Sequence, residues 1–184
     1  MPQWMHTLTV DASYDEASRV TGVGVVIQER VGASGRGPIL EQVAEAHIGV
    51  APGTGELFAV FRALEIAMDR GFTRIKIRSD YNAMRRDLRN RHRGRAAAEN
   101  ELQNKVLELA RRFVWVDFGY VARRKNQIAH ALARKGCFIA RSTEDVPGSV
   151  EGTAPNFKWK GRTVNAVPSS GAVLVYRMVS GRAG

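Results

Sequence analysis

The segment 6–26 constrains the fold of this chain most, because it combines two apolar strands with a carboxylate between them. Polar and apolar side chains alternate from His6 to Val10, the period of a half-buried strand. Gly22, Gly24 and the valines around them predict a second strand that pairs with the first in antiparallel fashion. Asp11 directly follows the first strand, where a buried carboxylate is costly unless a partner such as a metal ion compensates it.

Asp11 by itself also fits a simpler interpretation. An aspartate in a turn often makes a local hydrogen bond, here with Ser13 or Tyr14. Both interpretations stay open until the rest of the chain is considered.

The composition indicates a globular protein with a strongly basic charge balance. The chain has 184 residues, enough for one domain with a moderate tail, and its 28 Lys and Arg against 18 Asp and Glu give a net charge of +10. A solvated basic surface explains such a charge as well as a nucleic acid does. One short segment favours the nucleic acid, because like charges repel there unless an anion is bound; it contains Arg85, Arg86, Arg89, Arg91, Arg93 and Arg95.

Cysteine content and hydropathy bear on location. The single Cys137 excludes an internal disulfide and a cysteine-based zinc site. The first ten residues hold no apolar run of signal-peptide length, and no stretch approaches the roughly 18 apolar residues of a membrane span. We therefore expect a cytoplasmic protein without a membrane partner, and no motif points to an obligate protein partner.

Periodicity along the chain predicts an α/β domain. Three antiparallel strands come first, and a helix with an apolar i, i+3, i+4 stripe then leads to a fourth strand. A right-handed crossover through that helix makes the fourth strand parallel to the first. The expected elements are strands at 6–10, 23–29 and 39–50, a helix at 56–70, a strand at 73–78, helices at 81–89 and 96–112, a strand at 113–121 and a helix at 126–135.

Three acids occupy informative places in this order. Asp80 follows the fourth strand, so Asp11 and Asp80 are expected at neighbouring strand ends on one edge of the sheet. Glu56 lies in the first turn of the first helix, where the helix dipole alone also favours a negative charge. Asn126 is expected to cap the last helix and Gly136 to end it, with Ile128 and Leu132 facing the core. His130 is offset from these apolar positions and also fits an ordinary exposed histidine.

Together these segments resemble type 1 ribonuclease H over about residues 6–136. The matching pieces are VDAS around Asp11, GVGVV on the next strand, GELFAVFRAL around Glu56, IRSD around Asp80 and NQIAHALA around His130. The resemblance implies a ribonuclease H-like fold with a five-stranded mixed sheet and flanking helices. It also implies endonucleolytic hydrolysis of the RNA strand of an RNA/DNA hybrid by two divalent cations, Mg²⁺ or Mn²⁺.

In that family the acids hold the metal ions, so Asp11, Glu56, Asp80 and His130 are the implied catalytic and metal-binding residues. The sequence departs from the family at the fourth position, which usually carries aspartate and here carries His130. Imidazole suits manganese better than magnesium, so we expect activity that favours Mn²⁺. Alternatively, His130 lies near the metals and takes part in proton transfer or product release.

Substrate contacts are predicted from the same resemblance. Many members grip the hybrid with asparagines before the helix glutamate, whereas this chain has Pro52, Gly53, Thr54 and Gly55 there, which weakens the expectation of strict hybrid specificity. The predicted nucleic-acid-binding residues are Ser13, Asn82, Asn126 and the arginine cluster Arg85, Arg86, Arg89, Arg91, Arg93 and Arg95.

The composition changes beyond Gly136, and we expect a catalytic domain at 1–140 and an appendage at 141–184. A polar linker at 142–155 precedes two alternating segments, 156–166 and 172–179, that are expected to form a β-hairpin. Two other functions stay open: a non-catalytic module that only binds hybrid or duplex nucleic acid, and a nuclease of the same fold with another substrate.

Overall fold

The computed structural model describes residues 5–32, 37–51, 53–82, 84, 88, 97–144, 157–159, 162–164 and 173–179. In these residues the elements are β1 (His6–Asp15), β2 (Val20–Glu29), β3 (Ile39–Ile48), α1 (Gly55–Asp69), β4 (Arg74–Ser79), α3 (Ala97–Ala110), β5 (Trp115–Tyr120), the 3-10 helix η1 (Arg123–Lys125), α4 (Gln127–Glu144), β6 (Phe157–Trp159), β7 (Arg162–Val164) and β8 (Val173–Val179).

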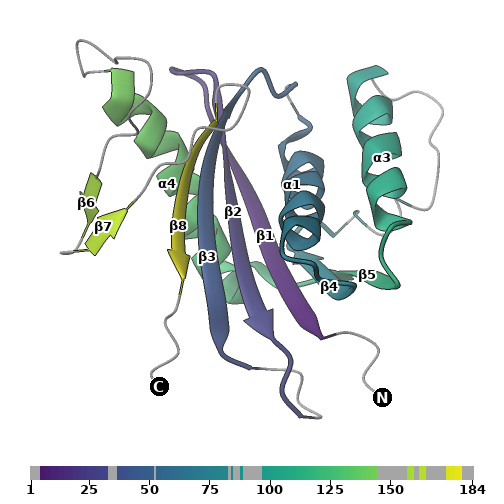
Figure 1. Cartoon of the computed structure of the whole chain (residues 1–184). Coiled ribbons are helices and arrows are strands. Elements are labelled where there is room, and N and C mark those ends of the chain that lie inside the picture. The colour runs from purple at the N-terminus through teal and green to yellow at the C-terminus, as the bar shows by residue number, and fades with distance from the viewer. Residues whose placement is uncertain are drawn as a thin grey trace.

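The predicted mixed sheet is confirmed. Strands β1, β2 and β3 pair in antiparallel fashion, while β4 is parallel to β1 and β5 is parallel to β4. The parallel pairs follow from the helical connections, which carry the chain back before each of these strands begins. The full order is β5-β4-β1-β2-β3-β8, so the tail contributes a sixth strand (Figure 1).

The tail strands pair differently from the expected hairpin between 156–166 and 172–179. Strand β8 lies antiparallel to β3, and β6 and β7 form a separate two-stranded sheet. Residues 173–179 thus cover the backbone edge of β3. The division of the chain into 1–140 and 141–184 stays a prediction.

Helices cover the two faces of the sheet (Figure 1). Helix α1 packs on β1, β2 and β4, and α3 packs on α1. The main core forms beneath α1 from Leu8, Val10, Ile75, Ile77 and Leu64, among others. Helix α4 lies on the other face over β1, β2 and β3, with a second apolar cluster beneath it. None of the described helices is long and apolar enough to cross a membrane.

Glycines bring α4 into direct contact with the sheet. A Cβ atom on Gly22 would lie 1.9 Å from the carbonyl oxygen of Ala133, and one on Gly24 would lie 2.1 Å from that of Ala129. From the helix side, a Cβ on Gly136 would lie 2.1 Å from the carbonyl oxygen of Glu45. Only residues without a side chain fit at these three places.

Two expectations for the last helix were wrong. Gly136 does not end the helix, which continues to Glu144, because this glycine serves the close contact with β3. Ile128 does not face the core, since 47% of it is exposed, whereas Ala129 and Leu132 are buried. A small residue fits the gap between helix and sheet better than a branched one.

Strand β1 is also longer than expected. Asp11 was placed at the end of the strand, but β1 runs on to Asp15, because its pairing with β2 continues past the last residue of β4. The aspartate that makes the local turn contact is Asp15, which accepts hydrogen bonds from the backbone N–H and the hydroxyl of Ser18. Asp11 is therefore not a turn aspartate.

A buried ionic network joins β3 to α1. Glu45 is 2% exposed, and both its oxygens accept hydrogen bonds from Arg62, at 2.8 and 2.9 Å. The Nε2 of His47 lies 2.7 Å from the same carboxylate. Burial alone raises the pKa of Glu45, but the bonds from Arg62 and His47 prevail and lower it to about 2. This acid is ionised and fully paired within the fold.

The direct contact between α4 and the sheet predicts whether one substitution raises or lowers the free energy of unfolding. Replacing glycine by alanine inside a helix ordinarily stabilises it by about 1 kcal/mol. At Gly136 the added Cβ meets backbone, so we expect Gly136→Ala to lower the free energy of unfolding by about 3 kcal/mol in urea titrations.

The matched control is Gly119→Ala. Its Cβ would first meet the flexible end of Lys76, at 3.0 Å, and we expect a loss below about 1 kcal/mol. Equal losses in the two variants, or a stabilised Gly136→Ala protein, would contradict the close-contact interpretation.

Candidate active site

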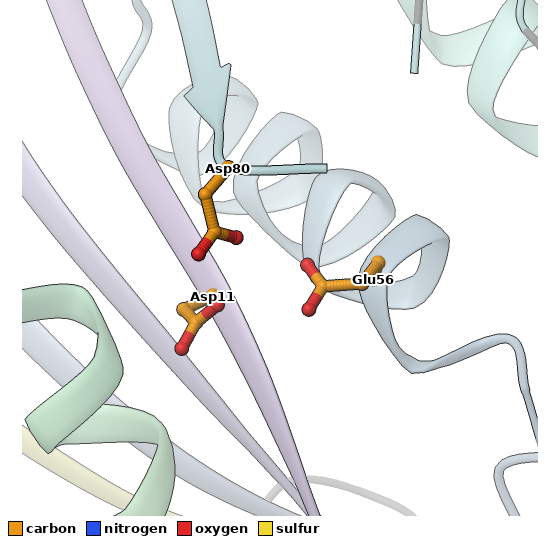
Figure 2. A group of neighbouring side chains, drawn as sticks. All are labelled: Asp11, Glu56 and Asp80. Carbon is orange, nitrogen blue, oxygen red and sulfur yellow. The ribbon is translucent and has the colours of Figure 1, made fainter. Parts of the chain in front are cut away.

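Three acids from three elements point into one space (Figure 2). Asp11 lies on β1, Glu56 in the first turn of α1, and Asp80 directly after β4. Each offers a carboxylate oxygen, and these atoms all lie within 4.8 Å of one another. The acids that the sequence suggested are thus brought together by the fold.

The register of β1 and β4 explains why Asp11 and Asp80 lie close together. Strand β4 ends at Ser79, the register partner of Val10, so Asp80 leaves the sheet beside Asp11. The buried hydroxyl of Ser79 accepts a hydrogen bond from the backbone N–H of Tyr81 at 3.0 Å and lies 3.4 Å from Glu56. Ser79 therefore links the end of β4 to the start of α1.

Helix α4 adds a histidine to the site. The Nδ1 atom of His130 lies 2.7 Å from the Oδ2 atom of Asp11. Asn126, just before the helix, donates from Nδ2 to the carbonyl oxygen of Val10 at 3.1 Å, which anchors the helix start to β1. His130 contacts Asp11, and it does not belong to the metal-ligand cluster found among the described residues.

The electrostatics of the three acids favour a cation. Burial, followed by the charges of Asp11 and Asp80, raises the pKa of Glu56 to about 8. Burial also raises the pKa of Asp11, although the hydrogen bond with His130 opposes the shift. Close carboxylate oxygens are the ligands that Mg²⁺ and Mn²⁺ prefer, so this donor set fits a divalent ion.

The residues predicted to contact nucleic acid differ in their location and exposure. Ser13 lies two residues beyond Asp11 on the same strand and is half-buried, and Asn82 is exposed shortly after Asp80. Asn126 is 1% exposed and bonded to Val10, so it supports the site from inside instead of facing a ligand. The predicted cluster Arg85, Arg86, Arg89, Arg91, Arg93 and Arg95 lies outside the described residues.

One feature near the site was not assigned from the sequence. Arg123, Arg124 and Lys125 form the turn η1 between β5 and α4, and all three are exposed. The turn directly precedes Asn126 and so lies near the start of α4. The run of three cations was the sequence signal that could have identified it.

Comparisons with known proteins agree with this architecture. A family model described as reverse transcriptase-like matches residues 9–136. No curated protein matches the chain. Among solved structures, ribonuclease H1 from the archaeon Halobacterium salinarum NRC-1 has a TM-score of 0.63 at 22% identity, over 73% of this chain and 98% of that one.

Two further structures are similar. LC11-RNase H1, isolated from compost and solved in complex with an RNA/DNA hybrid, has a TM-score of 0.61 at 19% identity, over 74% of this chain and 99% of that one. The N-terminal RNase H domain of a Mycobacterium tuberculosis protein has a TM-score of 0.59 at 18% identity, over 71% and 96% of the chains. These likenesses confirm the ribonuclease H fold.

The raised pKa of Glu56 predicts how stability depends on pH without metal. The folded protein binds this proton up to about pH 8, whereas the unfolded chain releases it near 4.5, so stability falls as the pH rises between these values. In EDTA we expect the melting temperature of the wild type to be lower at pH 8.5 than at pH 5.5.

Glu56→Gln provides the control, because its side chain does not titrate. We expect this variant to lose most of the pH dependence and to melt above the wild type at high pH. Adding Mn²⁺ should raise the melting temperature of the wild type more than that of the variant. A wild-type melting temperature that rises with pH over this range would refute the electrostatic assignment.

Proposed function

The chain belongs to the reverse transcriptase-like family, and from this premise we propose that it hydrolyses the RNA strand of RNA/DNA hybrids as a metal-dependent endonuclease. The observation that carries the proposal is the convergence of Asp11, Glu56 and Asp80, whose ligand atoms lie within 4.8 Å of one another. The hybrid complex of LC11-RNase H1, which shares the fold, supports this choice of substrate.

The three carboxylates would hold the divalent ions. Bound ions would supply the Lewis acidity that activates a water molecule and stabilises the leaving 3′ oxygen. Asp11 belongs to this cluster and also contacts His130 of α4, so it would hold an ion together with either of the other two acids. Repulsion among the acids costs stability when no ion is bound, as the raised pKa of Glu56 indicates, and ion binding would remove that cost.

His130 acts, in this proposal, as a positioning residue for Asp11. With a proton on Nδ1 it donates to Asp11 Oδ2 and fixes the direction of that carboxylate. Asn126 and the glycine contacts of α4 in turn fix the place of the histidine. The alternative, direct metal ligation by His130, predicts a different response to substitution.

The first experiment measures cleavage of an RNA/DNA hybrid labelled on the RNA strand, in Mg²⁺ and separately in Mn²⁺. We expect metal-dependent cleavage, and a loss in Asp11→Asn beyond the roughly 10- to 100-fold typical of residues that only support a metal site. Duplex DNA and duplex RNA serve as comparison substrates, and a thermal melt checks that the variant is folded.

Each other outcome has a defined meaning. Binding of the hybrid without cleavage in either metal would refute hydrolysis and favour a non-catalytic module. Cleavage of another duplex in preference to the hybrid would refute the proposed substrate while keeping the metal-dependent chemistry.

Substitutions at His130 separate positioning from ligation. Asparagine keeps an N–H donor for Asp11, so we expect His130→Asn to retain more activity than His130→Ala, which should lose about 10- to 100-fold. Direct ligation by His130 predicts instead that the wild type favours Mn²⁺ and that His130→Asp narrows the difference in activity between the two metals.

The readout that distinguishes the roles is the metal concentration at half-maximal activity. If His130 positions Asp11, His130→Asn should reach half-maximal activity at a metal concentration close to that of the wild type. Equal rises in His130→Asn and His130→Ala would instead identify His130 as a direct ligand.

A further inference from the structure

Helix α4 covers only part of its face of the sheet. It packs on β1, β2, β3 and β8, and no helix in the described part of the chain packs extensively on the same face of β4 and β5. The other face of these two strands belongs to the main core, where Ile75 and Ile77 are fully buried. Within the described residues, one half of the outer face therefore has no covering helix and is open in this sense, beside the start of α4.

The open half carries a row of cations, which we call the basic face. Strand β4 contributes alternate residues to it, and their register partners on β5 lie on the same side. The basic face consists of Arg74, Lys76 and Arg78 on β4 with Trp115, Asp117 and Gly119 on β5.

The geometry of the basic face holds its cations close to the sheet. Alternate residues of a strand are about 6.6 Å apart, so the three cations form a row along β4. A Cβ on Gly119 would lie 3.0 Å from Cε of Lys76 and 3.8 Å from Cγ of Arg78. The absence of a side chain at this glycine lets the stems of Lys76 and Arg78 lie across β5.

The basic face carries three cations and one acid. Asp117 forms an ion pair with Lys76 at 3.1 Å, and it is the one acid among the six residues of the face. Both partners of this pair are one-quarter exposed. Arg74 and Arg78 add two planar guanidinium groups, which match phosphate oxygens better than any other side chain does. The exposed turn η1 extends the positive charge beyond the end of β5.

We propose that the basic face binds the backbone phosphates of duplex nucleic acid, as a second contact surface besides the acidic site. A net charge of +10 and a row of regularly spaced cations along β4 suit a regular polyanion. Because the contacts are to phosphates, the binding is independent of sequence and sensitive to salt. The surface does not depend on hydrolysis, so it stands apart from the proposed function.

The test measures binding of a labelled DNA duplex of about 20 base pairs, two helical turns, by fluorescence anisotropy in EDTA over a range of salt concentrations. The variant is Arg74→Gln/Arg78→Gln, which leaves the pair of Lys76 and Asp117 intact. Each lost phosphate contact lowers the slope of log K against log salt by about 0.9, so we expect a slope smaller by about 1.8 and weaker binding.

The matched control removes two cations from the opposite side of the molecule. Lys105 and Arg111 are exposed on and directly after α3, which packs on α1. We expect Lys105→Gln/Arg111→Gln to bind the duplex with the slope of the wild type. Equal changes in the two double variants, or no change in Arg74→Gln/Arg78→Gln, would overturn the proposal.

A second measurement uses the wild-type chain and so does not depend on the folding of a variant. Addition of the duplex should shift the backbone amide NMR signals of Trp115 and Gly119 more than those of α3. Shifts confined to other elements would overturn the proposal. The assay contains neither RNA nor divalent ions, so failure of hybrid cleavage would leave its outcome unaffected, and the two failures are distinguishable.

Discussion

The direct contact of α4 with the sheet is the constraint on which the rest of the structure depends. Three glycines, Gly22, Gly24 and Gly136, remove the side chains that would otherwise hold helix and strands apart. At this short distance His130 reaches Asp11 and Asn126 reaches the backbone of Val10. A helix held further out would leave Asp11 without its histidine, because an imidazole is too short to bridge the added gap.

Two acids show how the same fold treats buried charge in opposite ways. Glu45 receives hydrogen bonds from Arg62 and His47, and its pKa is lowered to about 2. Glu56 faces Asp11 and Asp80 instead, and burial together with their charges raises its pKa to about 8. The first acid is satisfied by an arginine and a histidine, whereas the second faces two further acids, a donor set that fits a divalent cation. Such electrostatic imbalance is typical of functional sites.

The nature of the fold and the identity of the acids were largely predictable from the sequence. Alternation in β1 and β4 and the helical stripe of α1 predicted the antiparallel β1, β2 and β3 and the parallel pairing of β4 with β1. Asp11 and Asp80, next to these elements, were correctly expected to be neighbours. Strand register was not predictable, since alternation assigns a side chain to a face without saying where a pairing ends. For this reason the sequence suggested that Asp11 ends the first strand, whereas in the structure it lies within β1.

The sequence by itself determined which residues of β4 and α1 face the core, because period and polarity are local properties of the chain. Only the tertiary structure decided what those residues meet. Gly136 has the same sequence signal whether it ends a helix or allows a close contact, and the position of Glu45 on β3 decides between the two. In the same way, β8 pairs with β3, and the side chain of Asn126 donates to the carbonyl oxygen of Val10. In both cases the partners are far apart in the chain, so no local sequence pattern predicts the contact.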